Sequence, residues 1–145
     1  SEEQVTKSII DWLQSCSHRV LSYDYPGSGT GQLIKPLGEM RKSVGIKPDI
    51  LSSSHGYAFY FENKPSLDLS DIRKINEIRG SKEMIEAIGK ATGVVPPNVR
   101  FGIGTANLDG ARLKKHSSVL DFAVSVESGR VLAVLGAEYF SAPDL

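Results

Sequence analysis

The stretch KPDILSSSHGYAFYFENK, residues 47–64, decides the fold of this chain. Its middle, residues 52–56, is a cluster of serine, histidine and glycine, and such clusters are typical of turns. The flanking segments 46–51 and 57–63 are short and rich in apolar residues, so we expect two strands that fold back on each other. A β-hairpin is therefore the predicted centre of the fold.

The second strand of this hairpin sorts its side chains by face. Because side chains alternate along a strand, Tyr60, Glu62 and Lys64 are expected on one face. Phe59 and Phe61 are then expected on the opposite face, where they point into a core. The strand thus carries an acid and a base side by side at its end.

Asp49 stands thirteen positions before Glu62, and the hairpin is expected to bring the two carboxylates together. Adjacent carboxylates repel, and each has a raised pKa unless a cation lies between them. A hard divalent ion, Mg²⁺ or Mn²⁺, suits such an all-oxygen pocket. Lys64 adds a positive charge beside a metal-bound water, a combination that suits hydrolysis of a phosphodiester.

The pattern Pro48-Asp49 followed by Glu62-Asn63-Lys64 resembles the PD-(D/E)xK nuclease superfamily, which includes type II restriction endonucleases and archaeal Holliday-junction resolvases. The resemblance implies a metal-dependent endonuclease that hydrolyses DNA phosphodiester bonds. Asp49, Glu62 and the backbone carbonyl of Asn63 would hold the Mg²⁺ or Mn²⁺ ion. Lys64 would orient the attacking water, help to deprotonate it and stabilise the charge of the transition state.

Residues 2–16 predict an amphipathic helix that docks on the core. Glu2 lies on the buried-facing stripe of this helix, whereas Glu3 points more to the side. In many members of the resembled superfamily a glutamate of the first helix joins the metal site, and Glu2 is our candidate for this catalytic role. Glu39 is a rival for the same role. The alternative is that Glu2 simply complements the dipole of the helix.

Further elements follow from capping residues, turn residues and periodicity. We expect strands at 19–23, 99–104, 119–126 and 130–139, helices at 71–79 (capped by Ser70) and 82–91 (capped by Ser81), a short helix near 37–43 and a helical segment at 108–116. The order resembles the αβββαβ core of the superfamily. It predicts an α/β fold, a restriction-endonuclease-like mixed central β-sheet flanked by helices. The C-terminal β-hairpin either extends this sheet or makes a dimer contact.

Basic residues gather before the motif, after it and near residues 112–116, and they form either a phosphate-tracking surface or ordinary solvated faces. The glycine-rich run 27–31 is no P-loop, because no GK[ST] follows it. A serine-containing loop follows the first strand in the resolvase branch, so this loop is a phosphate contact or, as we prefer, a plain loop. The candidate nucleic-acid contacts are Ser28, Thr30, Lys35, Arg41, Lys42 and Lys47.

The 145 residues predict a single nuclease-like domain, residues 1–145, with ordinary apolar content of 40% and charged content of 23%. No apolar run reaches transmembrane length, and the single cysteine, Cys16, fits a reducing compartment, so we expect a cytoplasmic protein with no membrane partner. The three histidines lack the spacing of a zinc site.

We expect DNA as the partner, with RNA as an alternative, although the zero net charge argues against nucleic-acid binding. A homodimer is a further expectation, because cutting both strands of a duplex needs two active sites. The competing functions are a catalytically inactive nuclease-fold module that binds nucleic acid or protein, and an RNA-cleaving domain of a larger protein.

Overall fold

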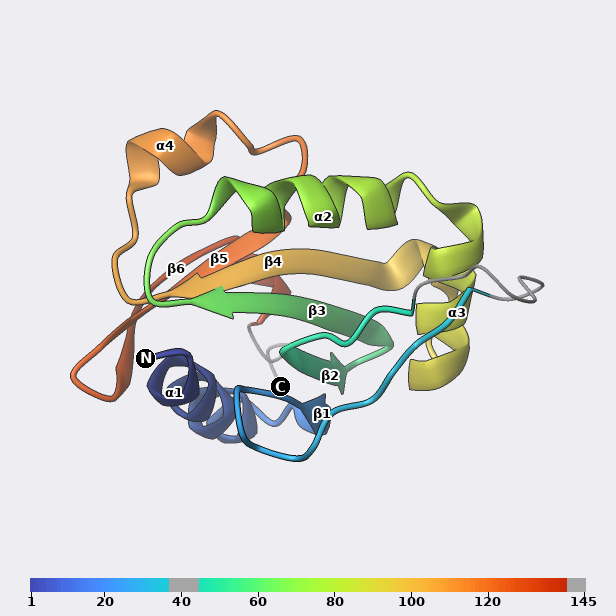
Figure 1. Ribbon diagram of the computed structural model, residues 1–145, viewed down its shortest axis with the longest axis horizontal. Coiled ribbons are helices and arrows are strands. Elements are labelled where there is room, and N and C mark those ends of the chain that lie inside the picture. The colour runs from blue at the N-terminus through green and yellow to red at the C-terminus, as the bar shows by residue number, and fades with distance from the viewer. Residues whose placement is uncertain (37–44, 141–145) are drawn as a thin grey trace.

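Six strands form one mixed sheet in the computed structural model, which describes residues 1–36 and 45–140 (Figure 1). The chain begins with α1 (Glu2–Ser15), β1 (Arg19–Tyr23), β2 (Ile50–Ser54), β3 (Tyr57–Lys64), α2 (Leu69–Arg79) and α3 (Lys82–Thr92). They are followed by η1 (Pro96–Asn98), β4 (Val99–Thr105), α4 (Gly110–Lys114), β5 (Phe122–Glu127), β6 (Arg130–Leu135) and η2 (Ala137–Tyr139). The short helix expected near 37–43, and with it Glu39, Arg41 and Lys42, lies outside the described residues.

The strands lie side by side in the order of the sequence, from β1 to β6. Neighbours pair antiparallel from β1 to β3, parallel from β3 to β5, and antiparallel again between β5 and β6. The parallel step from β3 to β4 is made by α2 and α3, because a crossover connection is needed between parallel strands. The expected α/β class with a mixed sheet flanked by helices is therefore confirmed, and the C-terminal hairpin extends the sheet.

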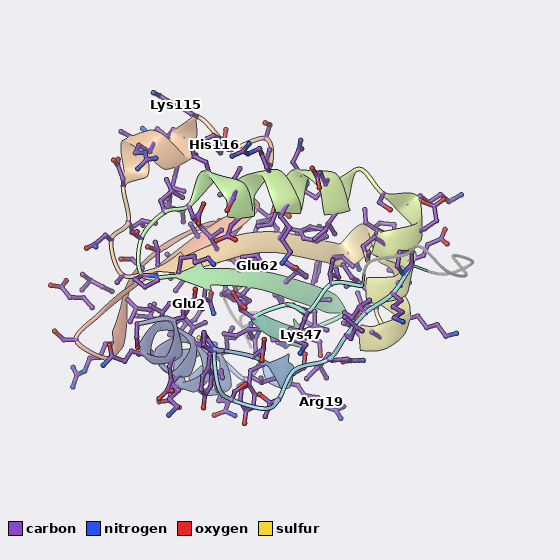
Figure 2. All side chains as sticks on the ribbon, in the orientation of Figure 1. Glu2, Arg19, Lys47, Glu62, Lys115 and His116 are labelled. Atoms are coloured by element: carbon purple, nitrogen blue, oxygen red, sulfur yellow. The ribbon has the colours of Figure 1, made fainter. Side chains whose placement is uncertain are left out.

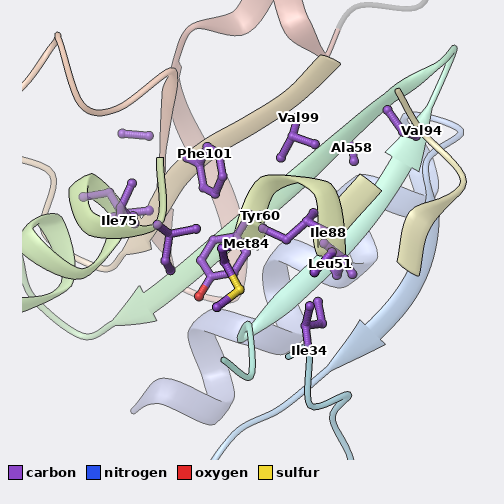
Figure 3. Close-up of a cluster of buried hydrophobic side chains, with 14 of the residues drawn as sticks. Ile34, Leu51, Ala58, Tyr60, Ile75, Met84, Ile88, Val94, Val99 and Phe101 are labelled. Carbon is purple, nitrogen blue, oxygen red and sulfur yellow. The ribbon is translucent and has the colours of Figure 1, made fainter. Parts of the chain in front are cut away.

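Helices cover both faces of the sheet, with α1 on one face and α2 on the other (Figure 1). On the α1 face, Phe59 and Phe61 pack with Ile9 and Phe122 in one buried cluster. On the α2 and α3 face, the second cluster includes Tyr60, Phe101, Ile75, Met84 and Ile88, as Figure 3 shows. The expected alternation along β3 is confirmed, since Phe59 and Phe61 face α1 and Tyr60 faces α2.

The central hairpin is tighter than the sequence indicated. Its turn consists of His55 and Gly56 alone, with φ of 51° and 81°, the left-handed pair of a two-residue turn that suits the twist of a hairpin. Residues 52–54 therefore belong to β2. Both predicted bounds of this strand, 46 and 51, were wrong, because β2 runs over Ile50–Ser54. Ile46 instead forms an isolated bridge with Ile34.

Caps explain where the helices start. Ser1 and Gln4 form a capping box on α1, and the Ser81 side chain accepts from the backbone N–H of Met84 at the start of α3, as predicted. The cap of α2 is Asp68 rather than Ser70, since the Asp68 carboxylate accepts from the Ser70 N–H at 2.9 Å.

Two apolar side chains are exposed although their positions in the sequence favoured burial. Leu69, which its spacing to Ile72 and Ile75 predicts to cover the sheet, is 44% exposed at the first residue of α2. In β6, Leu132 is 66% exposed where both faces were expected to be buried. The register between β5 and β6 shifts next to Leu132, which makes it the extra residue of a bulge.

The last strands are shorter than predicted, with β5 starting at Phe122 and β6 ending at Leu135. Gly136, with φ of 73°, turns the chain into η2 after β6. Among the described residues, no helix is long and apolar enough to cross a bilayer.

Candidate functional site at the end of β3

Asp49 and Glu62 lie opposite each other at the start of β2 and the end of β3. The antiparallel register pairs Ile50 with Phe61, so the next pair outward is Asp49 with Glu62. The backbone N–H of Asp49 donates to the Phe61 carbonyl at 3.0 Å, and the Asn63 N–H donates to Asp49 Oδ2 at 2.7 Å. The hairpin thus fixes the two carboxylates side by side on the face that α2 covers.

Burial and nearby negative charge raise the pKa of Asp49 and of Asp71. Burial, followed by the negative charge of Glu62, raises the pKa of Asp49 to about 7, although the hydrogen bond from Asn63 lowers it. Burial also raises the pKa of Asp71, on the first turn of α2, to about 6. The ionised forms of Asp49 and Asp71 are therefore unfavourable in the folded protein, and such raised pKa values are common at functional sites.

Two groups from the chain compensate the charge of Glu62, whose residue is only 4% exposed. The Tyr60 hydroxyl donates to Glu62 Oε2, and Lys74 Nζ lies 3.1 Å from the same oxygen. Burial, followed by the charge of Glu62, raises the pKa of Tyr60, so this hydroxyl keeps its proton. Sequence reasoning did not single out Tyr60 or Lys74 for the site. The available signal was the spacing of Asp71 and Lys74, which places both on one face of α2.

Lys64, the last residue of β3, meets Glu2 across the end of the sheet. Lys64 Nζ lies 3.2 Å from Glu2 Oε1, and Figure 2 shows Glu2 and Glu62 on either side of β3. Burial lowers the pKa of Lys64, but the negative charges of Asp71, Glu2 and Asp49 outweigh it, so the pKa is raised. Glu3 instead pairs with Lys7 at 3.0 Å on the exposed side of α1. Of the two glutamates in this helix, the predicted Glu2 is the one that reaches the site.

The side chain of Asn63 points to the other face and joins β3 to α1. Asn63 Nδ2 donates to Thr6 Oγ1 at 3.1 Å, while Oδ1 is buried and has no hydrogen-bond partner in the described part of the chain. Gly104 on the neighbouring strand makes room for this amide, because an added Cβ would overlap Asn63 Oδ1 and Ile9. Gly102 likewise permits close packing of β4, because an added Cβ there would overlap Phe122.

The donor set fits a magnesium ion. Mg²⁺ is commonly bound by one or two carboxylates, and water completes its octahedral shell. Asp49 and Glu62 are two such carboxylates, although within residues 1–36 and 45–140 no group of three or more His, Cys, Asp or Glu side chains forms a metal cluster. Four carboxylates face two ammonium groups at the end of β3 (Glu2, Asp49, Glu62 and Asp71 against Lys64 and Lys74). When all of these groups are ionised, the excess is two negative charges, the charge that one divalent cation balances.

The predicted phosphate contacts of the loop after β1 are engaged within the loop itself. Ser28 Oγ donates to Asp24 Oδ1 at 3.0 Å and accepts from the Thr30 N–H at 3.2 Å. Thr30 Oγ1 donates to the Tyr23 carbonyl at 2.8 Å. These bonds favour the structural role of the loop. Lys35 and Lys47 are exposed to solvent, whereas Arg41 and Lys42 lie outside the described residues.

Comparison with known proteins found no family model that matches the sequence and no solved structure that matches the fold. Any function must therefore be argued from the residues of this chain and their geometry.

Proposed function

We propose that this chain is a metal-dependent endonuclease that hydrolyses DNA phosphodiester bonds. The single observation that carries the proposal is the pairing of Asp49 with Glu62 across the β2–β3 hairpin, with Lys64 at the end of the same strand. The arrangement has the chemistry that phosphodiester hydrolysis requires: oxygen ligands for a metal and an ammonium beside them.

Each residue has a defined role in this proposal. Asp49, Glu62 and the Asn63 carbonyl would hold Mg²⁺ or Mn²⁺, which when bound lowers the pKa of a water and polarises the phosphate. Lys64 would orient the water and stabilise the negative charge that develops on phosphate oxygens. Because the pKa of Lys64 is raised, its side chain is an ammonium at neutral pH, which favours charge stabilisation over proton abstraction. Glu2 would position Lys64 through their ion pair.

The element order supports a restriction-endonuclease-like core. Helix α1, the antiparallel strands β1 to β3, the helical crossover and the parallel strand β4 reproduce the sequence αβββαβ. In this core the motif residues come from the middle of the sheet, where β2 and β3 are buried on both faces. A buried origin restrains the side chains, and restrained groups hold a metal with less loss of entropy.

A second candidate is a catalytically inactive module of the same fold that binds nucleic acid or protein. The observation that favours it is that Glu62 already has a counter-ion from the chain, Lys74, and Lys64 has one in Glu2. A site neutralised by its own lysines has less need of a metal. Metal binding and cleavage therefore separate the two candidates.

The proposal is tested by incubating supercoiled plasmid, single-stranded DNA and single-stranded RNA with the protein in Mg²⁺ or Mn²⁺. Wild type is compared with Asp49→Ala, Lys64→Ala and the control Lys82→Ala, whose side chain is 84% exposed on α3. We expect cleavage of DNA that EDTA abolishes, a loss of about 100-fold or more in both site variants, and an unchanged control. Absence of metal-dependent cleavage, or equal cleavage by the site variants, contradicts the proposal. Direct conversion of plasmid to the linear form would indicate two sites acting together, as in a homodimer.

A further inference from the structure

Lys74 reaches from α2 to the carboxylate at the centre of the site. Its ammonium lies 3.1 Å from Glu62 Oε2, and its side chain is 41% exposed while that of Glu62 is 5% exposed. We infer that Lys74 couples metal binding to substrate binding: it neutralises Glu62 without a metal, and is released to bind a phosphate of the DNA once a metal holds this carboxylate. This inference rests on the proposed function and deepens it.

The first step of the inference is the competition for Glu62. A buried carboxylate needs compensation, and Glu62 obtains it from the Tyr60 hydroxyl and the Lys74 ammonium on one oxygen, Oε2. A divalent cation bound to Glu62 would place its two positive charges close to the ammonium of Lys74. Like charges this close repel, so Lys74 and the metal cannot both be held fully by Glu62.

The second step is that Lys74 can move away from Glu62, whereas Tyr60 cannot. Tyr60 is completely buried between the sheet and α2. Lys74 is part-exposed on a flexible four-carbon stem, so its ammonium can move into solvent once a metal compensates the charge of Glu62. Lys74 is therefore the exchangeable partner of Glu62.

The third step is where the released ammonium goes. The positive charge of Lys74 also lowers the pKa of both Asp49 and Asp71, so its position on α2 faces the whole acidic group. A phosphodiester drawn to a metal at Asp49 and Glu62 would bring its negative oxygens within reach of this lysine. An ammonium is a strong donor to phosphate. Metal and phosphate would then each favour the binding of the other, since coupling between two ligands is reciprocal.

The competition is tested by the affinity for Mn²⁺, measured by electron paramagnetic resonance of the free ion without DNA. The variants are Lys74→Gln, Lys74→Arg, which keeps the charge, and the control Arg73→Gln. Arg73 is the adjacent, exposed residue of α2, so its loss changes the net charge equally. We expect Lys74→Gln to bind Mn²⁺ about three- to fivefold more tightly than wild type, and Lys74→Arg and Arg73→Gln to stay within about twofold.

The phosphate role is tested in the Lys64→Ala background, in which the proposed function predicts cleavage about 100-fold or more slower. Binding of a fluorescent DNA duplex in Mn²⁺ is measured by anisotropy with and without Lys74→Gln. We expect Lys74→Gln to weaken duplex binding about three- to tenfold, and more than Arg73→Gln does.

The outcomes separate the two proposals. Unchanged Mn²⁺ affinity in Lys74→Gln, or an equal change in Arg73→Gln, overturns the inference and leaves the nuclease proposal standing. Tighter Mn²⁺ binding without weaker duplex binding overturns the release of Lys74 to phosphate. A wild type that binds no Mn²⁺ overturns both proposals.

Discussion

Replacing Asp49 by asparagine should stabilise the metal-free protein at alkaline pH. The Asp49 carboxylate is partly buried and faces Glu62, so its charge opposes folding. An asparagine keeps an acceptor for the Asn63 N–H, which donates to Asp49 Oδ2 at 2.7 Å. Its NH₂ group would face the Glu62 carboxylate and replace repulsion by attraction.

The magnitude follows from the pKa of Asp49, which is raised from 3.8 to about 7 in the folded protein. Each pKa unit corresponds to about 1.4 kcal/mol, so complete burial would make the ionised form cost about 4 kcal/mol. Solvent screening at a partly exposed group halves this to about 2 kcal/mol. For a chain of this size, such a difference is about 6 to 8 °C in Tm.

The sign of the pH dependence is fixed by the raised pKa. Between pH 4 and 7 the folded state holds a proton on Asp49 that the unfolded state has lost, so this group makes stability fall as the pH rises. The advantage of Asp49→Asn is therefore complete above pH 7 and absent below about pH 4. Asp71, with a pKa raised to about 6, adds a slope of the same sign, but it is present in both proteins and cancels in the difference.

The assay is thermal and urea denaturation of wild type, Asp49→Asn and the control Asp11→Asn in EDTA, at pH 8 and at pH 4. Asp11 is exposed on α1, so its neutralisation should change stability by less than about 0.5 kcal/mol. If Asp49→Asn is no more stable than wild type at pH 8, or if its advantage is equal at both pH values, the electrostatic argument for this site is refuted.

Three further predictions concern other parts of the fold. Burial, followed by the charge of His55, lowers the pKa of His18 to about 4. The stability that the neutral imidazole contributes is therefore complete above pH 6.5 and is lost as the pH falls toward 4. NMR titration of the imidazole should show this low pKa, and a midpoint near 6.5 would contradict it. Gly104→Ala should destabilise by about 2 kcal/mol or more in urea, because the new Cβ overlaps packed side chains, whereas Gly110→Ala, which meets no atom within 4 Å, should not destabilise. Tyr60→Phe removes the hydroxyl that donates to Glu62 and should cost about 1.5 to 3 kcal/mol by the same measurement; a cost below about 0.5 kcal/mol would argue against this bond.

Local signals explain which elements could be predicted from the sequence. Strand β1 runs over residues 19–23 as predicted, because an alternating run there is bounded by turn residues. Helix α3 was predicted from its N-cap Ser81, and Gly93 ends it in a left-handed conformation. The pairing of Asp49 with Glu62 was predictable because strand period and a central turn leave few registers.

The missed features depend on tertiary packing. Serine is common in turns, so residues 52–54 looked like part of the turn, yet Ser52 is fully buried in a strand between two neighbours. The sequence around Lys74 does not predict its contact with Glu62, because that contact depends on how α2 lies over β3. The exposed Leu69 shows the same limit, since the Asp68 cap, two residues before the predicted Ser70, makes Leu69 the first residue of α2.

The two candidate functions differ in what balances the excess negative charge at the end of β3. In an inactive module Lys74 would stay paired with Glu62, and the ionised Asp49, whose pKa is raised, would always destabilise the fold. In a nuclease a bound divalent ion would compensate the charge of Asp49 and stabilise the fold. Mg²⁺ should therefore raise the Tm of wild type and leave the Tm of Asp49→Asn almost unchanged, because a ligand stabilises only a fold that binds it. This difference needs no substrate, and it can be measured before any nucleic acid is chosen. A wild type whose stability is indifferent to Mg²⁺ and Mn²⁺ would favour the inactive module.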